Sequence, residues 1–285
     1  MEECVLLSTD WKSALAELVS HTRSHLMIAS PYVTGEGVAF LMDNRSPTLH
    51  SITFVTDLSP TNVCDGATDP NALGVLMAGV PSVTVRHLPR LHAKVYVGDA
   101  RCAIITSANL TIGGLQRNYE YGVKVLDPAV AASVFRDISK YSELGAFVAR
   151  ENLQVYCDLA NRLRATYRRE RQSASRALRV EFETHLAEAQ DELLRLRLAE
   201  GPMHTVFAKT IQYLLGAHGP LTTEQLHPRI KSIHPDLCDN GVDRVIDGKS
   251  YGKKWKHAVR SAQQQLKRQG LVILDDDRWR LTAPI

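Results

Sequence analysis

Several features that mark large classes of protein are missing from this sequence. No apolar run approaches the roughly 20 residues that a membrane-spanning helix needs, so we expect no membrane anchor. The opening residues, MEECVLLSTDWK, carry acidic side chains where a secretory signal carries basic ones. The five cysteines are scattered and have no C-x-x-C spacing, which argues against a disulfide framework and a structural zinc site. We therefore expect a cytoplasmic protein.

Charge is unevenly distributed along a chain whose composition is otherwise that of a globular protein. Of its 285 residues, 44% are hydrophobic and 23% are charged, which suits one large domain or two modest ones. The net charge of +3 divides into 11 Lys+Arg against 14 Asp+Glu in residues 1–149, 10 against 9 in 150–200, and 13 against 8 in 201–285. Residues 249–268 hold seven basic side chains and no acidic one. This run indicates a polyanionic partner, with a solvated helix face as the alternative.

Residues 1–150 alternate between strand and helix patterns. Amphipathic spacing predicts a helix from Trp11, and 71–80 is expected to be a short helix after a loop at 59–72. Short β-branched runs closed by turn residues predict strands at 26–30, 51–57, 82–88, 93–99, 103–108 and 121–127. We expect an α/β fold, a mixed sheet sandwiched by helices.

Two further segments follow this domain. Residues 151–200 contain no glycine or proline and are rich in Arg, Glu, Ala and Leu, which predicts a helical connector that bends near 168–177. We expect it to pack on one or both domains, or on a second subunit. Residues 201–285 contain three helical stripes and then two short strands, with a capping box at Thr222 and Gln225 and a helix-ending glycine at Gly270. That order resembles a winged-helix DNA-binding domain.

Chemistry-bearing residues concentrate between 91 and 125. His92 and Lys94 stand two apart, hence on one face of a predicted strand, and Ser107 and Asn109 end the next. Glu120 precedes the strand after that. An imidazole, a fixed cation, an amide and a carboxylate suit a phosphoryl-transfer site. A lone histidine on a strand is more often exposed or structurally satisfied, so the spacing has to decide.

The spacing is that of a known family. His92-x-Lys94-x4-Asp99, then Thr106-Ser107-x-Asn109 and Asn118-x-Glu120, closely resembles the signature of the phospholipase D superfamily. The usual pattern has a small pair, often Gly-Ser, where this chain has Thr106-Ser107. A hydrophobic strand followed by Ser30-Pro31-Tyr32 is also similar to the first strand of that fold.

The resemblance implies a role for each matching residue. His92 would attack phosphorus and form a covalent phosphohistidine. Lys94 and Asn109, assisted by Ser107, would bind the nonbridging oxygens, and Glu120 would hydrogen-bond the His92 ring. The aspartate that matches Asp99 orients the site from a distance. The family's reaction needs no metal ion and no cofactor.

The resemblance also implies a dimer. The family uses two such histidines, one as nucleophile and one as general acid, and this chain has only one H-x-K-x4-D motif. We therefore expect a homodimer in which His92 of each subunit meets at the two-fold axis, so that the active site is shared.

The same chemistry serves phospholipids and nucleic acids, and the basic tail favours DNA as the partner. The candidate DNA-binding residues are Lys249, Lys253, Lys254, Lys256, Arg260, Gln264, Lys267 and Arg268. We therefore predict a metal-independent DNA endonuclease, with restriction or defence as the first biological hypothesis. A phospholipid-processing phosphodiesterase, and a DNA-binding regulator whose first half serves only for dimerisation, remain alternatives.

Overall fold

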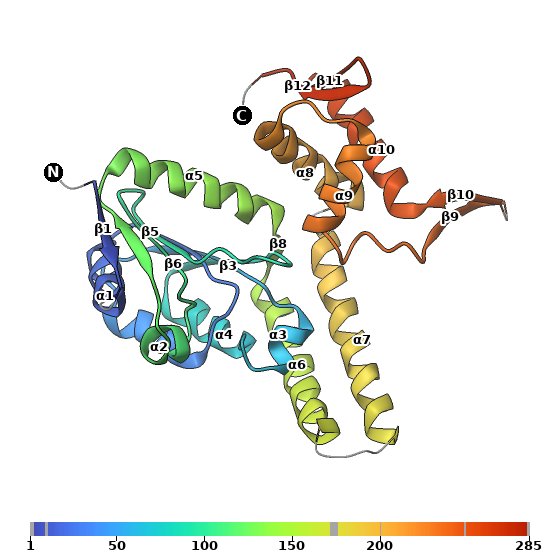
Figure 1. Cartoon of the computed structure of the whole chain (residues 1–285). Helices are drawn as coiled ribbons and strands as arrows, with labels where there is room; N and C mark the ends of the chain where they lie inside the picture. Colours follow the sequence, from blue (N-terminus) through green and yellow to red (C-terminus); the bar gives the residue numbers. More distant parts are fainter. Residues whose placement is uncertain (1–2, 9–10, 172–175, 200, 248, 284–285) are drawn as a thin grey trace. The chain divides into compact units, whose positions relative to one another are not determined.

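A computed structural model describes residues 3–8, 11–171, 176–199, 201–247 and 249–283 (Figure 1). The chain divides into two compact units, Met1–Arg197 and Leu198–Ile285, which we call the N-terminal and the C-terminal unit. No helix in these described ranges is long and apolar enough to cross a bilayer.

An eight-stranded mixed sheet forms the frame of the N-terminal unit, in the order β1-β7-β6-β5-β2-β3-β4-β8. Neighbours β2, β3 and β4 run parallel, and the other neighbouring pairs are antiparallel. Strands β2 to β7 confirm the six predicted runs, whereas the edge strands β1 and β8 were not predicted. The strands are β1 (Cys4–Leu7), β2 (His25–Ala29), β3 (Ser51–Thr56), β4 (Ser82–His87), β5 (Val95–Gly98), β6 (Cys102–Thr106), β7 (Gly122–Val125) and β8 (Ala146–Val148).

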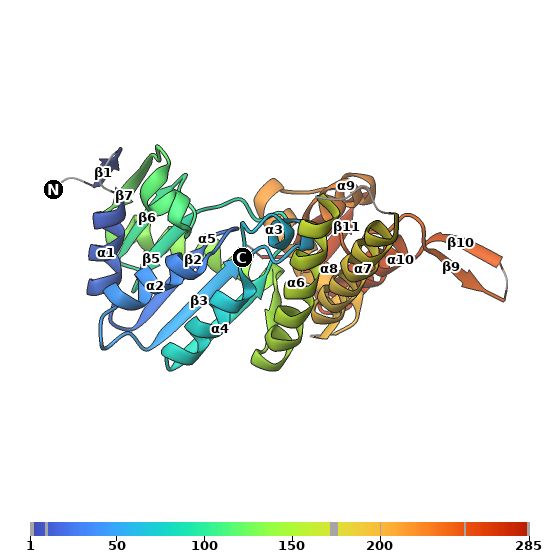
Figure 2. The same cartoon turned by 90° about the horizontal axis from the view of Figure 1, so that it is seen from below.

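Helices cover both faces of this sheet. Helix α5 lies along one face, and α1, α2 and α4 pack on the other, which is the side toward the viewer in Figure 2 (Figures 1 and 2). Asp127 caps α5 by accepting from the N–H groups of Ala129 and Val130, as the sequence Asp-Pro at a helix start favours. The predicted loop at 59–72 contains the short helix α3. These helices are α1 (Trp11–His21), α2 (Gly35–Asn44), α3 (Pro60–Cys64), α4 (Pro70–Gly79) and α5 (Pro128–Leu144).

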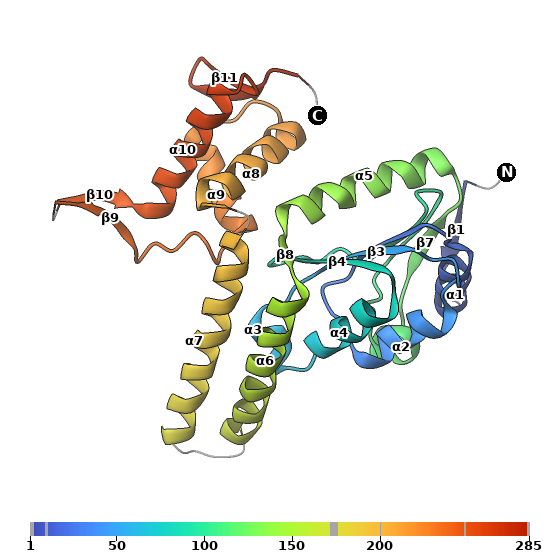
Figure 3. The same ribbon diagram turned by 180° about the vertical axis from the view of Figure 1, so that it is seen from behind.

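The residues expected to form a helical connector pack onto the sheet domain. They form α6 (Arg150–Arg171) and α7 (Arg176–Ala199), which lie side by side (Figure 3) and are joined by an ion pair between Arg162 and Glu188 at 3.3 Å. Tyr156 of α6 and Leu193 of α7 belong to the same buried core as the sheet. The centre of the expected bend, residues 172–175, lies outside the described residues.

The C-terminal unit has its own small core. Helix α8 (Met203–His218) packs its apolar stripe against α10 (Lys254–Arg268), and Phe207, Ile211 and Trp255 are buried there. Helix α9 (Thr223–Ile233) begins with the predicted capping box, and Gly270 follows α10 with φ +71°. The final hairpin joins β11 (Val272–Asp275) to β12 (Arg278–Leu281). Helix, helix, helix and hairpin thus follow the predicted order.

One element of this unit was not predicted. Strands β9 (Asp243–Ile246) and β10 (Lys249–Lys253) pair antiparallel between α9 and α10, and we call them together the hairpin arm. Lys253 Nζ lies 2.7 Å from Asp243 Oδ1, which closes the base of the arm. Lys249 and Lys253, expected next to the third helix, therefore belong to a strand.

Candidate active site

The candidate residues other than Asp99 lie where the ends of three neighbouring antiparallel strands come together. His92 and Lys94 lie directly before β5 and not within it, a correction to the predicted strand at 93–99. The Lys94 carbonyl accepts from Thr106 N–H at 3.1 Å, and Ser107 N–H donates to the Tyr121 carbonyl at 2.9 Å. The start of β5, the end of β6 and the start of β7 are therefore held side by side.

Lys94 provides a largely buried positive charge at this edge. Its side chain is only slightly exposed, and Nζ donates to the His92 carbonyl at 2.9 Å. Burial lowers the pKa of Lys94 from its ordinary value, while the nearby Glu120 carboxylate opposes this shift. A cation that is partly removed from water binds an anion more strongly than an exposed one does.

Glu120 orders the polar side chains around it. One carboxylate oxygen accepts from Asn118 Nδ2 at 3.1 Å, and the other accepts from Ser107 Oγ. Ser107 Oγ in turn accepts from Tyr121 N–H at 3.0 Å. In the described part of this single chain, Glu120 therefore binds Ser107 and Asn118 and makes no hydrogen bond to His92, whose side chain is exposed.

The Asn109 segment is positioned by close backbone packing. Leu110 N–H donates to Ser30 Oγ at 3.0 Å, which ties this segment to the Ser30-Pro31-Tyr32 turn. A Cβ on Gly114 would lie 2.3 Å from the Asn109 carbonyl oxygen, so only glycine allows this approach. Asn109 Oδ1 is buried and has no hydrogen-bond partner among the described residues. Its amide is thus not fully used by the fold.

Asp99 lies at the opposite end of β5 from Lys94 and is not brought to the site. Its carboxylate accepts from the backbone N–H groups of Arg23, Ser24 and His25 at 2.8–2.9 Å. Burial by itself would raise the pKa of Asp99, but these hydrogen bonds outweigh it and the net shift is downward. Asp99 therefore fixes the turn between α1 and β2 and acts on the site only through β5.

The turn that leads into His92 depends on a residue that the sequence did not single out. The buried Asp57 carboxylate at the end of β3 accepts from Arg90 N–H at 3.0 Å and from Ser59 N–H at 2.9 Å. Arg90 has φ +63°, a left-handed conformation that is unfavourable for arginine and needs such support. Asp57 is thus a positioning residue for the His92 segment. Its position as the last residue of the predicted strand 51–57 was the one available signal.

A second contact fixes the same region from outside the sheet. The Tyr156 hydroxyl of α6 donates to the Leu58 carbonyl, and Leu58 N–H donates to His87 Nδ1 at 3.0 Å. The long helix α6 therefore stabilises the strand ends that precede His92.

Comparison with known proteins agrees with this geometry. Residues 15–141 match the family described as "Cardiolipin synthase, PLD-like domain". That range contains α1 from Leu15 onward, strands β2 to β7 and the whole candidate site. The larger part of the N-terminal unit therefore matches a PLD-like domain. No curated protein sequence matches it.

Several solved structures are distantly similar. NucT from Helicobacter pylori shares 17% identity, with a TM-score of 0.41 over 50% of this chain and 96% of that one. Nuc from Salmonella typhimurium, a phospholipase D family member, shares 13% identity with the same TM-score and coverage. The phosphatidylserine synthase of Haemophilus influenzae Rd KW20 shares 16% identity with a TM-score of 0.41 over 49% of this chain and 37% of that one.

Proposed function

We propose that this protein is a phosphodiesterase of the phospholipase D superfamily that acts as a DNA endonuclease. The observation that carries the proposal is the meeting of His92, Lys94, Ser107, Asn109 and Glu120 at one sheet edge. A basic C-terminal unit in the same chain supports DNA as the substrate.

The reaction proceeds in two displacements. A ring nitrogen of His92 bonds to phosphorus as the bond to the leaving oxygen breaks, and a second histidine gives that oxygen a proton. Water then attacks the phosphohistidine, loses a proton to the second histidine and frees His92. Lys94 and Asn109 hold the nonbridging oxygens while charge on them increases. Ser107 is fixed by Glu120 and can donate little elsewhere, so its role is to orient the carboxylate.

His92 of a second copy supplies the second histidine. The His92 ring is exposed in one chain, and apolar or aromatic side chains next to the site are exposed as well. Tyr119 is fully exposed, and Tyr121 and Ile105 are 57% and 38% exposed. A two-fold dimer would cover this surface and bring the two histidines together.

The test of the activity is a cleavage assay on supercoiled plasmid in excess EDTA. We expect nicked and then linear DNA, because Lys94 rather than a metal ion neutralises the phosphate. Absence of cleavage both in EDTA and with added Mg²⁺ or Mn²⁺ refutes the nuclease. Release of a headgroup from anionic phospholipid vesicles under the same conditions would instead support the lipid alternative.

Subunit mixing tests the shared site. When the wild-type protein is mixed with an equal amount of the His92→Ala variant and the subunits are allowed to exchange, random pairing leaves about one quarter of the dimers fully wild type. We expect the specific activity to fall to about that fraction of an all-wild-type sample. Retention of about half, or a monomer by light scattering at assay concentration, contradicts a site built from two copies.

A further inference from the structure

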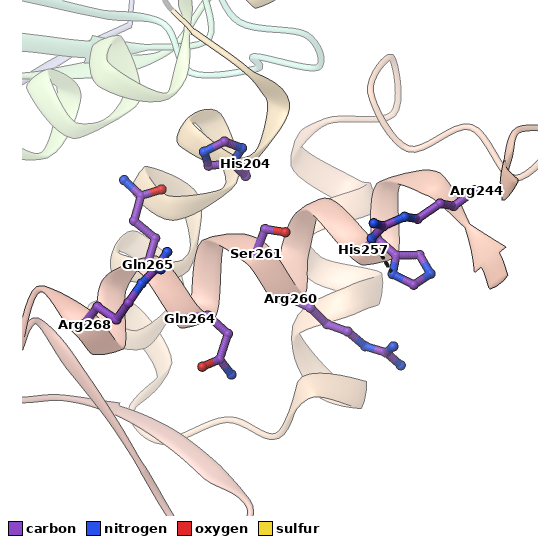
Figure 4. Close-up of a pocket in the computed structure, with 8 residues that line it drawn as sticks. All are labelled: His204, Arg244, His257, Arg260, Ser261, Gln264, Gln265 and Arg268. Carbon is purple, nitrogen blue, oxygen red and sulfur yellow. Dashed lines mark hydrogen bonds between the residues drawn. The ribbon is translucent and has the colours of Figure 1, made fainter. Parts of the chain in front are cut away.

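An open pocket of about 600 Å³ lies on the C-terminal unit between α10, the hairpin arm and the start of α8 (Figure 4). No carboxylate is among its lining residues. We call this surface the cationic groove. Its lining includes Arg244, His257, Arg260, Gln264, Gln265 and Arg268.

The groove follows from the amphipathic pattern of α10. Trp255, Val259 and Leu266 are buried against the core, so the opposite face of the helix points to solvent. Arg260, Gln264 and Arg268 follow one another at four-residue spacing on that face and are exposed. At 1.5 Å per residue they extend over about 12 Å of the helix. A row of this length suits a chain of phosphates better than a single small anion.

The hairpin arm contributes the third arginine. The Nη1 atom of Arg244, in β9, lies 3.4 Å from His257 Nδ1. His257 Nε2 donates to the Tyr251 carbonyl of β10 at 2.6 Å. Because a carbonyl only accepts, Nε2 carries the hydrogen, and a neutral His257 presents Nδ1 as the acceptor for Arg244. The arm is thereby attached to α10 through His257, and Arg244 lies next to His257 (Figure 4).

The arginines of the groove are not neutralised by carboxylates in the described ranges. In the described ranges, no Asp or Glu forms an ion pair with Arg244, Arg260 or Arg268. Gln265 Oε1 is buried and has no hydrogen-bond partner there. By contrast, the nearby Lys253 is neutralised by Asp243. Three guanidinium groups from two elements, none of them in an ion pair in the described ranges, thus line one surface.

We propose that the cationic groove binds the phosphate backbone of double-stranded DNA, with Arg260 and Arg268 of α10 and Arg244 of the arm each contacting phosphate. This inference rests on DNA being the substrate of the proposed nuclease, and it identifies the surface and the arm that hold it. The major groove of DNA is about 12 Å wide and admits an α-helix such as α10. A two-stranded ribbon beside the helix extends the contact along the duplex. Arginine suits the task because its planar donors pair with phosphate oxygens.

The proposal separates the basic residues of the tail into two sets. Lys249 Nζ lies 5.9 Å from the centre of the Tyr251 ring, and Lys256 Nζ lies 5.7 Å from the Trp255 ring. Neither they nor Lys267 line the groove. The arginines therefore contact DNA directly, and these lysines act through the longer-range field.

The test measures binding of a fluorescent duplex by full-length protein in which His92→Ala prevents cleavage, at several salt concentrations. Arg244→Ala, Arg260→Ala and Arg268→Ala are compared with Lys231→Ala, which removes an exposed charge of the same sign from the far end of α9. Each arginine variant should bind about tenfold more weakly and reduce the slope of log K against log salt by about 0.9, the loss of one phosphate contact. Arg244→Lys should restore most of the slope.

The outcomes are distinct. If Arg244→Ala binds as Lys231→Ala does, the arm is not part of the DNA surface and the proposal is wrong. If all three arginine variants match the control while the wild type still cleaves plasmid, the groove is refuted and the nuclease stands. If the wild type neither binds nor cleaves DNA, the proposed function fails. Thermal unfolding of each variant at the wild-type temperature shows that a loss of binding is not a loss of fold.

Discussion

The two units hold their functional side chains in different ways. In the N-terminal unit, Glu120 binds Ser107 and Asn118, and Asp57 holds the turn before His92. In the C-terminal unit, Arg260 and Arg268 extend from a single helix face with no ion pair in the described residues. One unit fixes polar groups against each other, whereas the other presents charge to solvent.

The difference fits what each proposed task requires. A displacement at phosphorus needs the nucleophile and the oxyanion donors in place to within a fraction of an ångström, so the site is built on packed strand ends. Binding to a phosphate backbone is sequence-independent and additive, and it tolerates long mobile side chains. We therefore expect substitutions in the N-terminal unit to change the rate, and substitutions in the C-terminal unit to change affinity and salt dependence.

We expect His92→Ala to have the largest effect and to distinguish most clearly between cleavage by the N-terminal unit and DNA binding by the C-terminal unit. Removing the nucleophile should reduce cleavage at least about 10³-fold, since the covalent step has no substitute. Duplex binding, measured by anisotropy, should remain within about twofold of wild type because the arginines of α10 are untouched. Cleavage at a wild-type rate would mean that another residue is the nucleophile. A parallel loss of duplex binding would mean that catalysis and DNA binding are not separated between the two units.

Asp57→Asn should have the next largest effect. Loss of the charged acceptor weakens the bond to Arg90 N–H, and a displacement of the His92 segment by about 1 Å costs up to about 100-fold in rate. We expect kcat to fall by about 10- to 100-fold with little change in KM.

The matched control for this variant is Asp65→Asn, which removes an exposed carboxylate that accepts from the Tyr167 hydroxyl at 3.0 Å. It should retain wild-type kinetics. A similar loss of kcat in both variants, or a rise in KM alone for Asp57→Asn, would count against Asp57 as a positioning residue.

The candidate active site and Asp57 show which residues can be predicted from the sequence and which cannot. His92, Lys94, Asn109 and Glu120 could be predicted because their spacing is a local signature, and the Thr222–Gln225 capping box because its two residues stand only three positions apart. Asp57 was missed because its contact with Arg90 joins positions 33 apart, and only the pairing of β3 with β4 brings the two segments together.

The same reasoning explains the missed strands. β1 and β8 have four and three residues and lie at the two edges of the sheet, where a short strand leaves too few alternations to detect. β9 and β10 contain Asp243, Lys249 and Lys253, charged residues that read as loop or helix start. Their pairing includes a cross-strand ion pair between Lys253 and Asp243 that spacing along the chain does not reveal.

Asp99→Asn tests a third kind of role, structural support at the end of β5 away from the candidate active site. Because the net pKa of Asp99 is lowered in the folded state, its ionised form contributes stability above the ordinary carboxyl pKa, and this contribution is lost as pH falls through the lowered value. We expect the variant to lose about 2 kcal/mol near neutral pH, measured by denaturant unfolding. The difference from wild type should shrink in acid. A difference that is constant with pH would mean that the carboxylate's charge is not what stabilises the turn.

The smallest effect is expected from Lys267→Ala, which tests the comparison inside the C-terminal unit itself. Lys267 and Arg268 are neighbours near the end of α10 and are both exposed, but only Arg268 lines the cationic groove. Removing a charge that acts only through the screened field should weaken duplex binding by about twofold, against about tenfold for Arg268→Ala. Titrations of both variants at two salt concentrations check this difference. Equal losses would mean that the affinity for DNA depends on the total charge of α10 and not on contacts made by one of its faces. The C-terminal unit would then bind DNA through long-range electrostatic attraction alone.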